Sequence, residues 1–154
     1  MAQVKANTQR SIAAPAERVR TALADYTGTR PTLLTEQFSE YEVREGGTGA
    51  GTIVHWKLAA TSKRVRDCLI AVTEPDGKLV ETDQNSSMVT TWTVASEGAL
   101  PNGEVSSTVS VETTWNGAGG IGGFFERTFA PGGLRRIYDG VLANLDKAVR
   151  DPEG

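Results

Sequence analysis

The sequence predicts an α+β fold in which an antiparallel sheet packs against one long helix at the end of the chain. Residues 131–149 repeat apolar side chains at the i, i+3, i+4, i+7 spacing of an amphipathic helix. Between residues 38 and 115, apolar residues recur with a period of two, which is typical of strands. Short turns separate these strands, so neighbours must pair antiparallel. The long helix must then bury its apolar face against the sheet.

The start of the chain is expected to hold one strand and two short helices. Residues 4–12 alternate loosely and are rich in Thr, Ser and Gln, which suits an edge strand. Pro15 and Glu17 predict a helix over residues 15–25, because proline loses no needed N–H in the first turn and the acid favours the positive end of the helix dipole. A Thr-Gly pair ends this helix, and a second short helical piece is expected at about 31–35.

Six further strands are expected before the terminal helix. One of their turns is Glu74-Pro75-Asp76-Gly77, where proline pre-sets φ and glycine accepts a positive φ. Together with the first strand, seven strands are expected. No linker or repeat divides the chain, so we expect a single domain over 1–154. The expected strands cover residues 38–45, 51–60, 63–73, 78–83, 88–95 and 105–115.

Composition excludes several classes of protein. A formal net charge of −3 argues against a dedicated nucleic-acid binder. The first residues lack the apolar core of a signal peptide, and no apolar run approaches membrane-spanning length. We therefore expect a soluble, cytoplasmic protein with no nucleic-acid partner and no integral membrane segment. The sequence does not indicate an oligomeric state.

Few residues are suited to acid–base chemistry or metal binding. His55 is the only histidine, and it alternates with the apolar Val54 and Trp56, which predicts the outer face of the sheet. Cys68 lies mid-strand with no second cysteine, so it cannot form an internal disulfide and an inert thiol is expected. One His and one Cys on separate strands predict no metal site and no cofactor.

Two segments, together with the order of the elements, resemble a known superfamily. In residues 11–19, Ser-Ile-Ala-Ala-Pro-Ala-Glu-Arg-Val, a strand ends just before the proline that opens the first helix. In residues 49–56, Gly-Ala-Gly-Thr-Ile-Val-His-Trp, a Gly-x-Gly turn leads into a strand with an aromatic residue. Over essentially its whole length the chain resembles the START-like or SRPBCC superfamily, which includes birch-pollen-allergen-like proteins, lipid-transfer domains and bacterial polyketide cyclase/dehydrase proteins. The resemblance implies a helix-grip fold, with a seven-stranded antiparallel sheet curved around the terminal helix and a cavity between them.

The resemblance also implies a function. The cavity is expected to bind a small hydrophobic or amphipathic molecule, such as a lipid or a polyketide. One alternative is an enzyme of the polyketide cyclase or dehydratase type, and another is a regulatory or protein-interaction domain with a vestigial cavity. The resemblance implies no universal catalytic residue, because most members bind small hydrophobic molecules and only some catalyse a reaction. The expected ligand-binding residues, mostly aromatic, are Trp56, Arg66, Trp92, Trp115, Phe125, Phe129 and Tyr138.

Core packing is the simpler explanation for each aromatic residue alone, and we expect two or three to line the cavity. Thr90, Ser107 and Thr113 share strand faces with apolar residues, which suggests an interior with polar partners. On the strand 63–73 either face can be the inner one, with a slight preference for Arg66 on the surface.

The glycine-rich stretch at residues 117–122 matches the G-x-G-x-x-G pattern of dinucleotide-binding loops. The context of such a loop is missing, because no second parallel strand follows. We interpret the stretch as a flexible hinge. With the short aromatic helical segment expected at 124–129, it would gate the cavity mouth in the fold that the sequence resembles.

Overall fold

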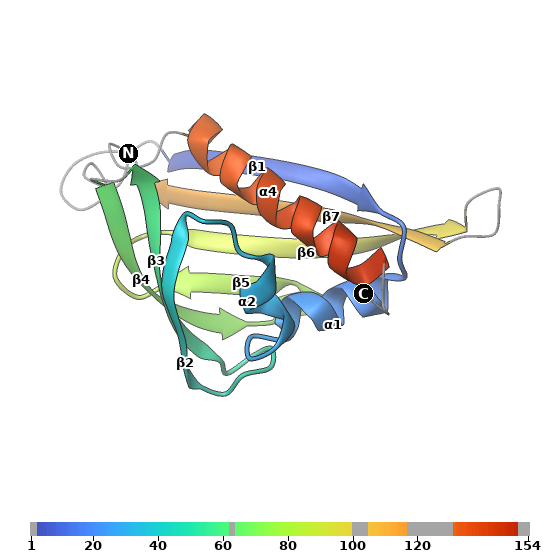
Figure 1. The fold of residues 1–154 in the computed structure, drawn as a ribbon, viewed down its shortest axis with the longest axis horizontal. Coiled ribbons are helices and arrows are strands. Elements are labelled where there is room, and N and C mark those ends of the chain that lie inside the picture. Colours follow the sequence, from blue (N-terminus) through green and yellow to red (C-terminus); the bar gives the residue numbers. More distant parts are fainter. Residues whose placement is uncertain (1–2, 62–63, 100–104, 117–130, 151–154) are drawn as a thin grey trace.

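The computed structural model describes residues 3–61, 64–99, 105–116 and 131–150 of the 154-residue chain. Within these ranges a large sheet forms one layer and the helices lie across one face of it (Figure 1). In chain order the elements are β1 (Gln3–Ile12), α1 (Ala16–Ala24), α2 (Thr29–Leu33), β2 (Phe38–Glu45), β3 (Ile53–Thr61), β4 (Arg64–Thr73), η1 (Pro75–Gly77), β5 (Leu79–Asp83), β6 (Val89–Ala99), β7 (Val105–Asn116) and α4 (Pro131–Arg150).

The sheet has seven strands in the order β1-β7-β6-β5-β4-β3-β2, and every neighbouring pair is antiparallel. Strands β2 to β7 follow one another as a meander, and β1 pairs with β7 at one edge, as in Val4 opposite Trp115. The predicted seven-stranded antiparallel sheet and the edge position of the first strand are confirmed.

The second helix begins earlier than predicted, at Thr29 rather than near residue 31. The Asp25 carboxylate explains this difference, because it accepts hydrogen bonds from the backbone N–H of Gly28 (3.1 Å) and of Thr29 (2.9 Å). It also accepts one from the Thr29 hydroxyl at 3.1 Å. Asp25 thus supplies acceptors for the N–H groups that the start of a helix leaves without intrahelical partners. These bonds lower the pKa of Asp25.

The hairpin of β6 and β7 is longer than predicted. Strand β6 continues to Ala99, and its pairing with β7 shifts between Ser96 and Gly98 before Ala99 meets Val105. By strand alternation Val105 shares a face of β7 with the buried Val109 and Val111, but it is 41% exposed. It lies at the far end of the hairpin, beyond the irregular pairing, where the strand has left the core. The segments predicted at 117–122 and 124–129 lie outside the described residues.

The long helix α4 buries one face, as its spacing predicts. It packs along β1 and also contacts α1 and α2. Each buried aliphatic side chain contributes about 1.5–3 kcal/mol from its removal from water. This helix therefore closes the interior against the inner face of the sheet. Its buried residues include Leu134, Ile137, Tyr138, Val141, Leu142, Leu145 and Val149.

A close approach between α4 and the segment that follows α2 gives a stability prediction. A Cβ added at Gly140 would lie 2.8 Å from Cγ2 of Thr35, whereas one at Gly132 in the same helix meets nothing within 4 Å. Alanine in a helix gains about 1 kcal/mol over glycine, but forced overpacking costs about 1–3 kcal/mol. We expect Gly140→Ala to lower the free energy of unfolding by about 1 kcal/mol, measured by urea denaturation.

Thr35→Ser provides the control, because it deletes Cγ2 and keeps the hydroxyl that donates to Gln37. In the Thr35→Ser background, Gly140→Ala should become stabilising, and Gly132→Ala should not destabilise in either background. If Gly140→Ala changes the free energy of unfolding equally with threonine and with serine at position 35, this contact does not limit the packing.

Candidate functional site

An ion pair between α2 and β5 lies in the interior of the protein. Arg30 Nη2 is 2.7 Å from Glu81 Oε2, and the two side chains are 2% and 3% exposed. Glu81 points inward because β5 alternates buried Leu79, Glu81 and Asp83 with half-buried residues. Arg30 comes from the opposite side of the interior, on the short helix that Asp25 caps. An ion pair removed from water needs further hydrogen bonds to offset the desolvation of both charges.

The Glu81 carboxylate has these additional bonds. The Tyr26 hydroxyl donates to Oε2 at 2.6 Å, and Nε1 of Trp92 donates to Oε1 at 2.9 Å. Trp92 lies on β6, next to β5, so the sheet itself holds this donor in position. Three donors, one of them charged, thus converge on one carboxylate. We refer to Tyr26, Arg30, Glu81 and Trp92 as the interior cluster.

The guanidinium of Arg30 is held on several sides. Its Nη1 donates to the carbonyl of Leu23 at 2.9 Å. Its Cζ lies 5.0 Å from the ring centroid of Tyr26 and 4.8 Å from that of Trp92, within range of cation–π attraction. Burial by itself would lower the pKa of Arg30, but the adjacent Glu81 raises it overall, so the side chain stays charged. Burial and Glu81 also raise the pKa of Tyr26, which keeps its hydroxyl protonated as a donor.

Three buried hydroxyl groups lie next to the interior cluster. Thr90 Oγ1 is 2.8 Å from Thr113 Oγ1, and the Tyr138 hydroxyl lies 3.2 Å from the first and 3.1 Å from the second. The ring of Tyr138 meets that of Trp92 edge to face, with centroids 5.7 Å apart. Burial raises the pKa of Tyr138 to about 12. This hydroxyl cluster, made of Thr90, Thr113 and Tyr138, joins α4 to the middle of the sheet.

The structure brings together some of the predicted site residues. Trp92 and Tyr138 are in contact with each other. Trp56 is also buried but packs elsewhere, against Phe38 edge to face and against Tyr41 in a stack. Trp115 is buried on β7 opposite Val4. The predicted Phe125 and Phe129 lie outside the described residues.

The slight preference for Arg66 on the surface was wrong. Cys68 and Ile70 are buried, whereas Val65 on the other face is 48% exposed, so the face that carries Arg66 is the inner one. Arg66 is half-buried, and its Nη2 donates to the carbonyl of Asn85 at 3.2 Å. Periodicity could not decide this, because both faces of β4 carry polar and apolar residues.

His55 lies on the face of β3 opposite Val54 and Trp56, as predicted. Its Nε2 is 2.7 Å from Asp67 Oδ1, and its Nδ1 is 3.0 Å from the carbonyl of Glu40. Cys68 is buried, and burial raises the pKa of its thiol. Among the residues that the structure describes, no three His, Cys, Asp or Glu side chains gather as a metal site requires.

Sequence reasoning missed Tyr26, Arg30 and Glu81. Glu81 belongs to a strand in which the inner face carries two acids and the outer face carries valine. Hydropathy would therefore predict the wrong face of this strand as the buried one. Arg30 belongs to a five-residue helix, too short for a periodic pattern. The predicted polar interior was a partial signal, because Thr90 and Thr113 are buried and hydrogen-bonded to each other.

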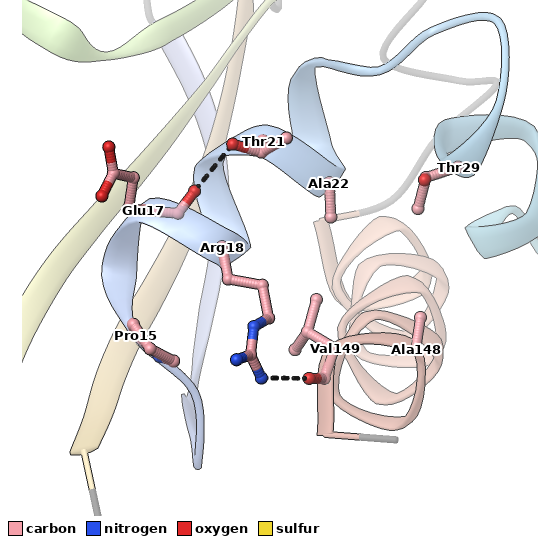
Figure 2. A pocket seen from close by; sticks show the side chains of 8 residues that line it. All are labelled: Pro15, Glu17, Arg18, Thr21, Ala22, Thr29, Ala148 and Val149. Atoms are coloured by element: carbon pink, nitrogen blue, oxygen red, sulfur yellow. Dashed lines mark hydrogen bonds between the residues drawn. The ribbon is translucent and has the colours of Figure 1, made fainter. Parts of the chain in front are cut away.

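Two hollows also lie between the helices. One of about 600 Å³ separates α1 from the end of α4, and Arg18 crosses it to donate to the carbonyl of Val149 at 3.2 Å (Figure 2). A second, of about 630 Å³, lies between α2 and α4 and shares Thr29 and Ala148 with the first. Both are open and lined by mixed polar and apolar residues, unlike the interior cluster.

With this geometry in place, comparison with known proteins identifies the family. Residues 3–150 match the family described as polyketide cyclase / dehydrase and lipid transport. The chain belongs to this family. A search of the curated proteins found no match. The solved structures include the KanY protein, studied by NMR, which is 49% identical with a TM-score of 0.83 over 97% of this chain and 99% of that one.

More distant structures share the fold. Norcoclaurine synthase from Thalictrum flavum, solved with dopamine and hydroxybenzaldehyde, is 16% identical, with a TM-score of 0.66 over 99% of this chain and 90% of that one. Major latex-like protein 151 from Panax ginseng is 15% identical, with a TM-score of 0.61 over 96% and 97%. The predicted helix-grip fold is therefore confirmed, and the family match confirms the predicted resemblance to polyketide cyclase/dehydrase and lipid-transport proteins. In the described part of the chain, no helix is both long and apolar enough to cross a membrane.

The ion pair gives a prediction about stability. Glu81→Leu leaves Arg30 charged and buried without its partner, so we expect it to lower the free energy of unfolding by about 3–5 kcal/mol. The double variant Arg30→Met/Glu81→Leu should lose less stability than the single variant, because no unpaired charge remains in the interior. Urea denaturation of both proteins measures the difference. Glu42→Gln, at an exposed ion pair with Arg44, is the control and should change stability little.

Tyr138 gives a prediction about pH. Its pKa is about 12 in the folded protein against 10.0 in an unfolded chain, so between these values only the unfolded state loses the proton. The free energy of unfolding should therefore be unaffected by Tyr138 below pH 10 and fall as the pH rises towards 12, by up to about 1.4 kcal/mol per pH unit. Tyr138→Phe should flatten this slope in denaturation measured from pH 9 to 11.5. Parallel slopes for the two proteins would contradict the assignment.

Proposed function

We propose that this protein binds a small hydrophobic or amphipathic molecule in its interior, between the sheet and α4. The observation that carries the proposal is the interior cluster. A buried ion pair is weak evidence for stability, since well-packed apolar residues of similar volume often serve as well. Polar groups held within an otherwise apolar interior are, in contrast, what a small-molecule site uses to orient its ligand. Membership of a family that includes lipid transport supports the same function.

The proposed ligand-binding residues are those whose side chains face this interior. Trp56, Trp92, Trp115 and Tyr138 are buried on the inner surface, and Arg66 lies half-buried on the inner face of β4. The proposal retains Phe125 and Phe129 as further contacts. The aromatic residues offer large apolar surfaces with few polar atoms, which suits an amphipathic ligand. That the protein acts in the cytoplasm and has no nucleic-acid partner stays a prediction from the sequence.

A cyclase or dehydratase is the second candidate. One observation favours it: the Tyr26 hydroxyl and the Glu81 carboxylate lie 2.6 Å apart beside the Arg30 guanidinium, so an acid, a base and a cation meet in one buried place. Such groups could move a proton on a ligand held against them. Binding leads, because each of these groups already has a partner within the protein. Turnover of a bound polyketide-like substrate, lost in Glu81→Gln, would favour the enzyme.

Binding can be tested with a neutral fluorescent probe, N-phenylnaphthylamine. Because the three tryptophans are buried in the interior, a bound probe should accept energy from them and saturate at one molecule per chain. Trp115→Phe should keep the fold and weaken binding of the probe severalfold, because it removes aromatic contact area. His55→Gln, on the opposite face of the sheet, is the control and should bind as the native protein does.

Native mass spectrometry of the purified protein gives an independent readout, since a retained ligand adds a defined mass. Failure to bind the probe, together with a ligand-free mass, would overturn the binding proposal. That result would leave a regulatory or protein-interaction role with a vestigial cavity.

A further inference from the structure

The interior cluster holds a hydrogen-bond donor that its own residues do not use. Arg30 directs Nη1 to the carbonyl of Leu23 and Nη2 to Glu81. Its Nε–H is buried and has no acceptor among the residues that the structure describes. Leaving a buried donor without an acceptor costs about 1–3 kcal/mol, so a group that accepts from Nε stabilises the cluster when it is present.

Both oxygens of the Glu81 carboxylate already accept hydrogen bonds from within the cluster. Glu81 Oε1 accepts from Trp92, and Oε2 accepts from both Tyr26 and Arg30. The group left without a partner is the Nε–H of Arg30, which can only donate, so the complementary group must be an acceptor. A ligand hydroxyl that only donates, or an ammonium group, does not fit here.

Charge narrows the choice of acceptor. Arg30 and Glu81 together are neutral, with their charged atoms 2.7 Å apart. A second carboxylate beside Glu81 would bring two like charges into a buried site, which is strongly unfavourable. A neutral carbonyl oxygen avoids this repulsion and still accepts a charge-assisted hydrogen bond. The rings of Tyr26 and Trp92 lie over the guanidinium, so the carbonyl would sit beside aromatic surface.

We propose that Arg30 Nε–H recognises the carbonyl oxygen of an uncharged, apolar ketone or ester in the interior, and that Glu81 is the positioning residue that holds Arg30. This inference rests on the proposed binding function and specifies its ligand. It distinguishes a carbonyl-bearing apolar molecule from a plain hydrocarbon and from a fatty-acid-like anion.

Three probes of equal shape separate these classes: acetylnaphthalene, isopropenylnaphthalene and naphthoate, each substituted at the same ring position. The first two differ only in C=O against C=CH2, and the third carries a carboxylate. Each is measured by displacement of N-phenylnaphthylamine from the native protein. We expect acetylnaphthalene to bind at least tenfold more tightly than the other two, because a hydrogen bond from a charged donor separates it from them.

Arg30→Lys tests the donor itself. Lysine keeps the positive charge opposite Glu81, but a methylene stands where arginine has Nε–H. We expect the preference for acetylnaphthalene over isopropenylnaphthalene to fall to less than threefold. Arg44→Lys, the same change at an exposed arginine, should keep the full preference. If Arg30→Lys does not fold, Arg30→Met/Glu81→Leu takes its place and should also lose the preference.

The outcomes separate the inference from the function on which it rests. Equal binding of all three probes to the native protein, or tighter naphthoate, overturns the carbonyl assignment and leaves binding intact. A ketone preference that survives the change at Arg30 shows that another donor is responsible, which also overturns it. Failure of every probe, N-phenylnaphthylamine included, together with a ligand-free mass of the purified protein, overturns the proposed function.

Discussion

Removing a guanidinium and a carboxylate from water is expensive, and the environment of Arg30 and Glu81 offsets that desolvation. The two charges lie 2.7 Å apart, and the carboxylate takes further hydrogen bonds from a tyrosine and a tryptophan. Each partner comes from a different element, so the pair fixes α2 and the segment after α1 against β5 and β6. The short helix α2 depends on this tertiary support, since five residues cannot form a stable helix alone.

The same contacts connect the two layers of the fold. From Glu81 the polar contacts reach Trp92, whose ring packs against Tyr138 of α4. Tyr138 in turn lies within hydrogen-bond distance of hydroxyls on β6 and β7. The terminal helix is thus held by apolar burial along most of its length and by a polar contact at one place. That place is also where a ligand between sheet and helix would meet polar atoms.

For a binding protein, this arrangement combines rigidity with selectivity. A cluster whose groups are already held by one another loses little conformational entropy when a ligand arrives. The aromatic side chains supply area, and the few polar atoms decide which ligands fit. Within a family that includes both lipid transport and cyclase activity, the same cluster is compatible with binding and with proton transfer, and the ligand chemistry distinguishes them.

The sequence by itself determined the elements whose periodicity is strong. The amphipathic spacing of residues 131–149 predicted α4, and the alternation from residue 38 onward predicted an antiparallel sheet, because both patterns follow from local backbone geometry. It also predicted that Trp92 and Tyr138 belong to the interior, although it placed neither beside a charge. Short elements were less certain, and α2 began two residues earlier because the side chain of Asp25 caps it.

Only the tertiary structure decided which charged residues lie inside. Arg30 and Glu81 are 51 positions apart in the sequence, and neither has a hydropathy pattern that predicts burial. The inner face of β4, and with it the position of Arg66, was likewise decided by packing rather than by alternation. A buried charge is stable only where it is paired or hydrogen-bonded. Here the partners come from distant segments of the chain, so the local sequence cannot predict which charged residues are buried. The candidate site therefore depends on the fold as a whole.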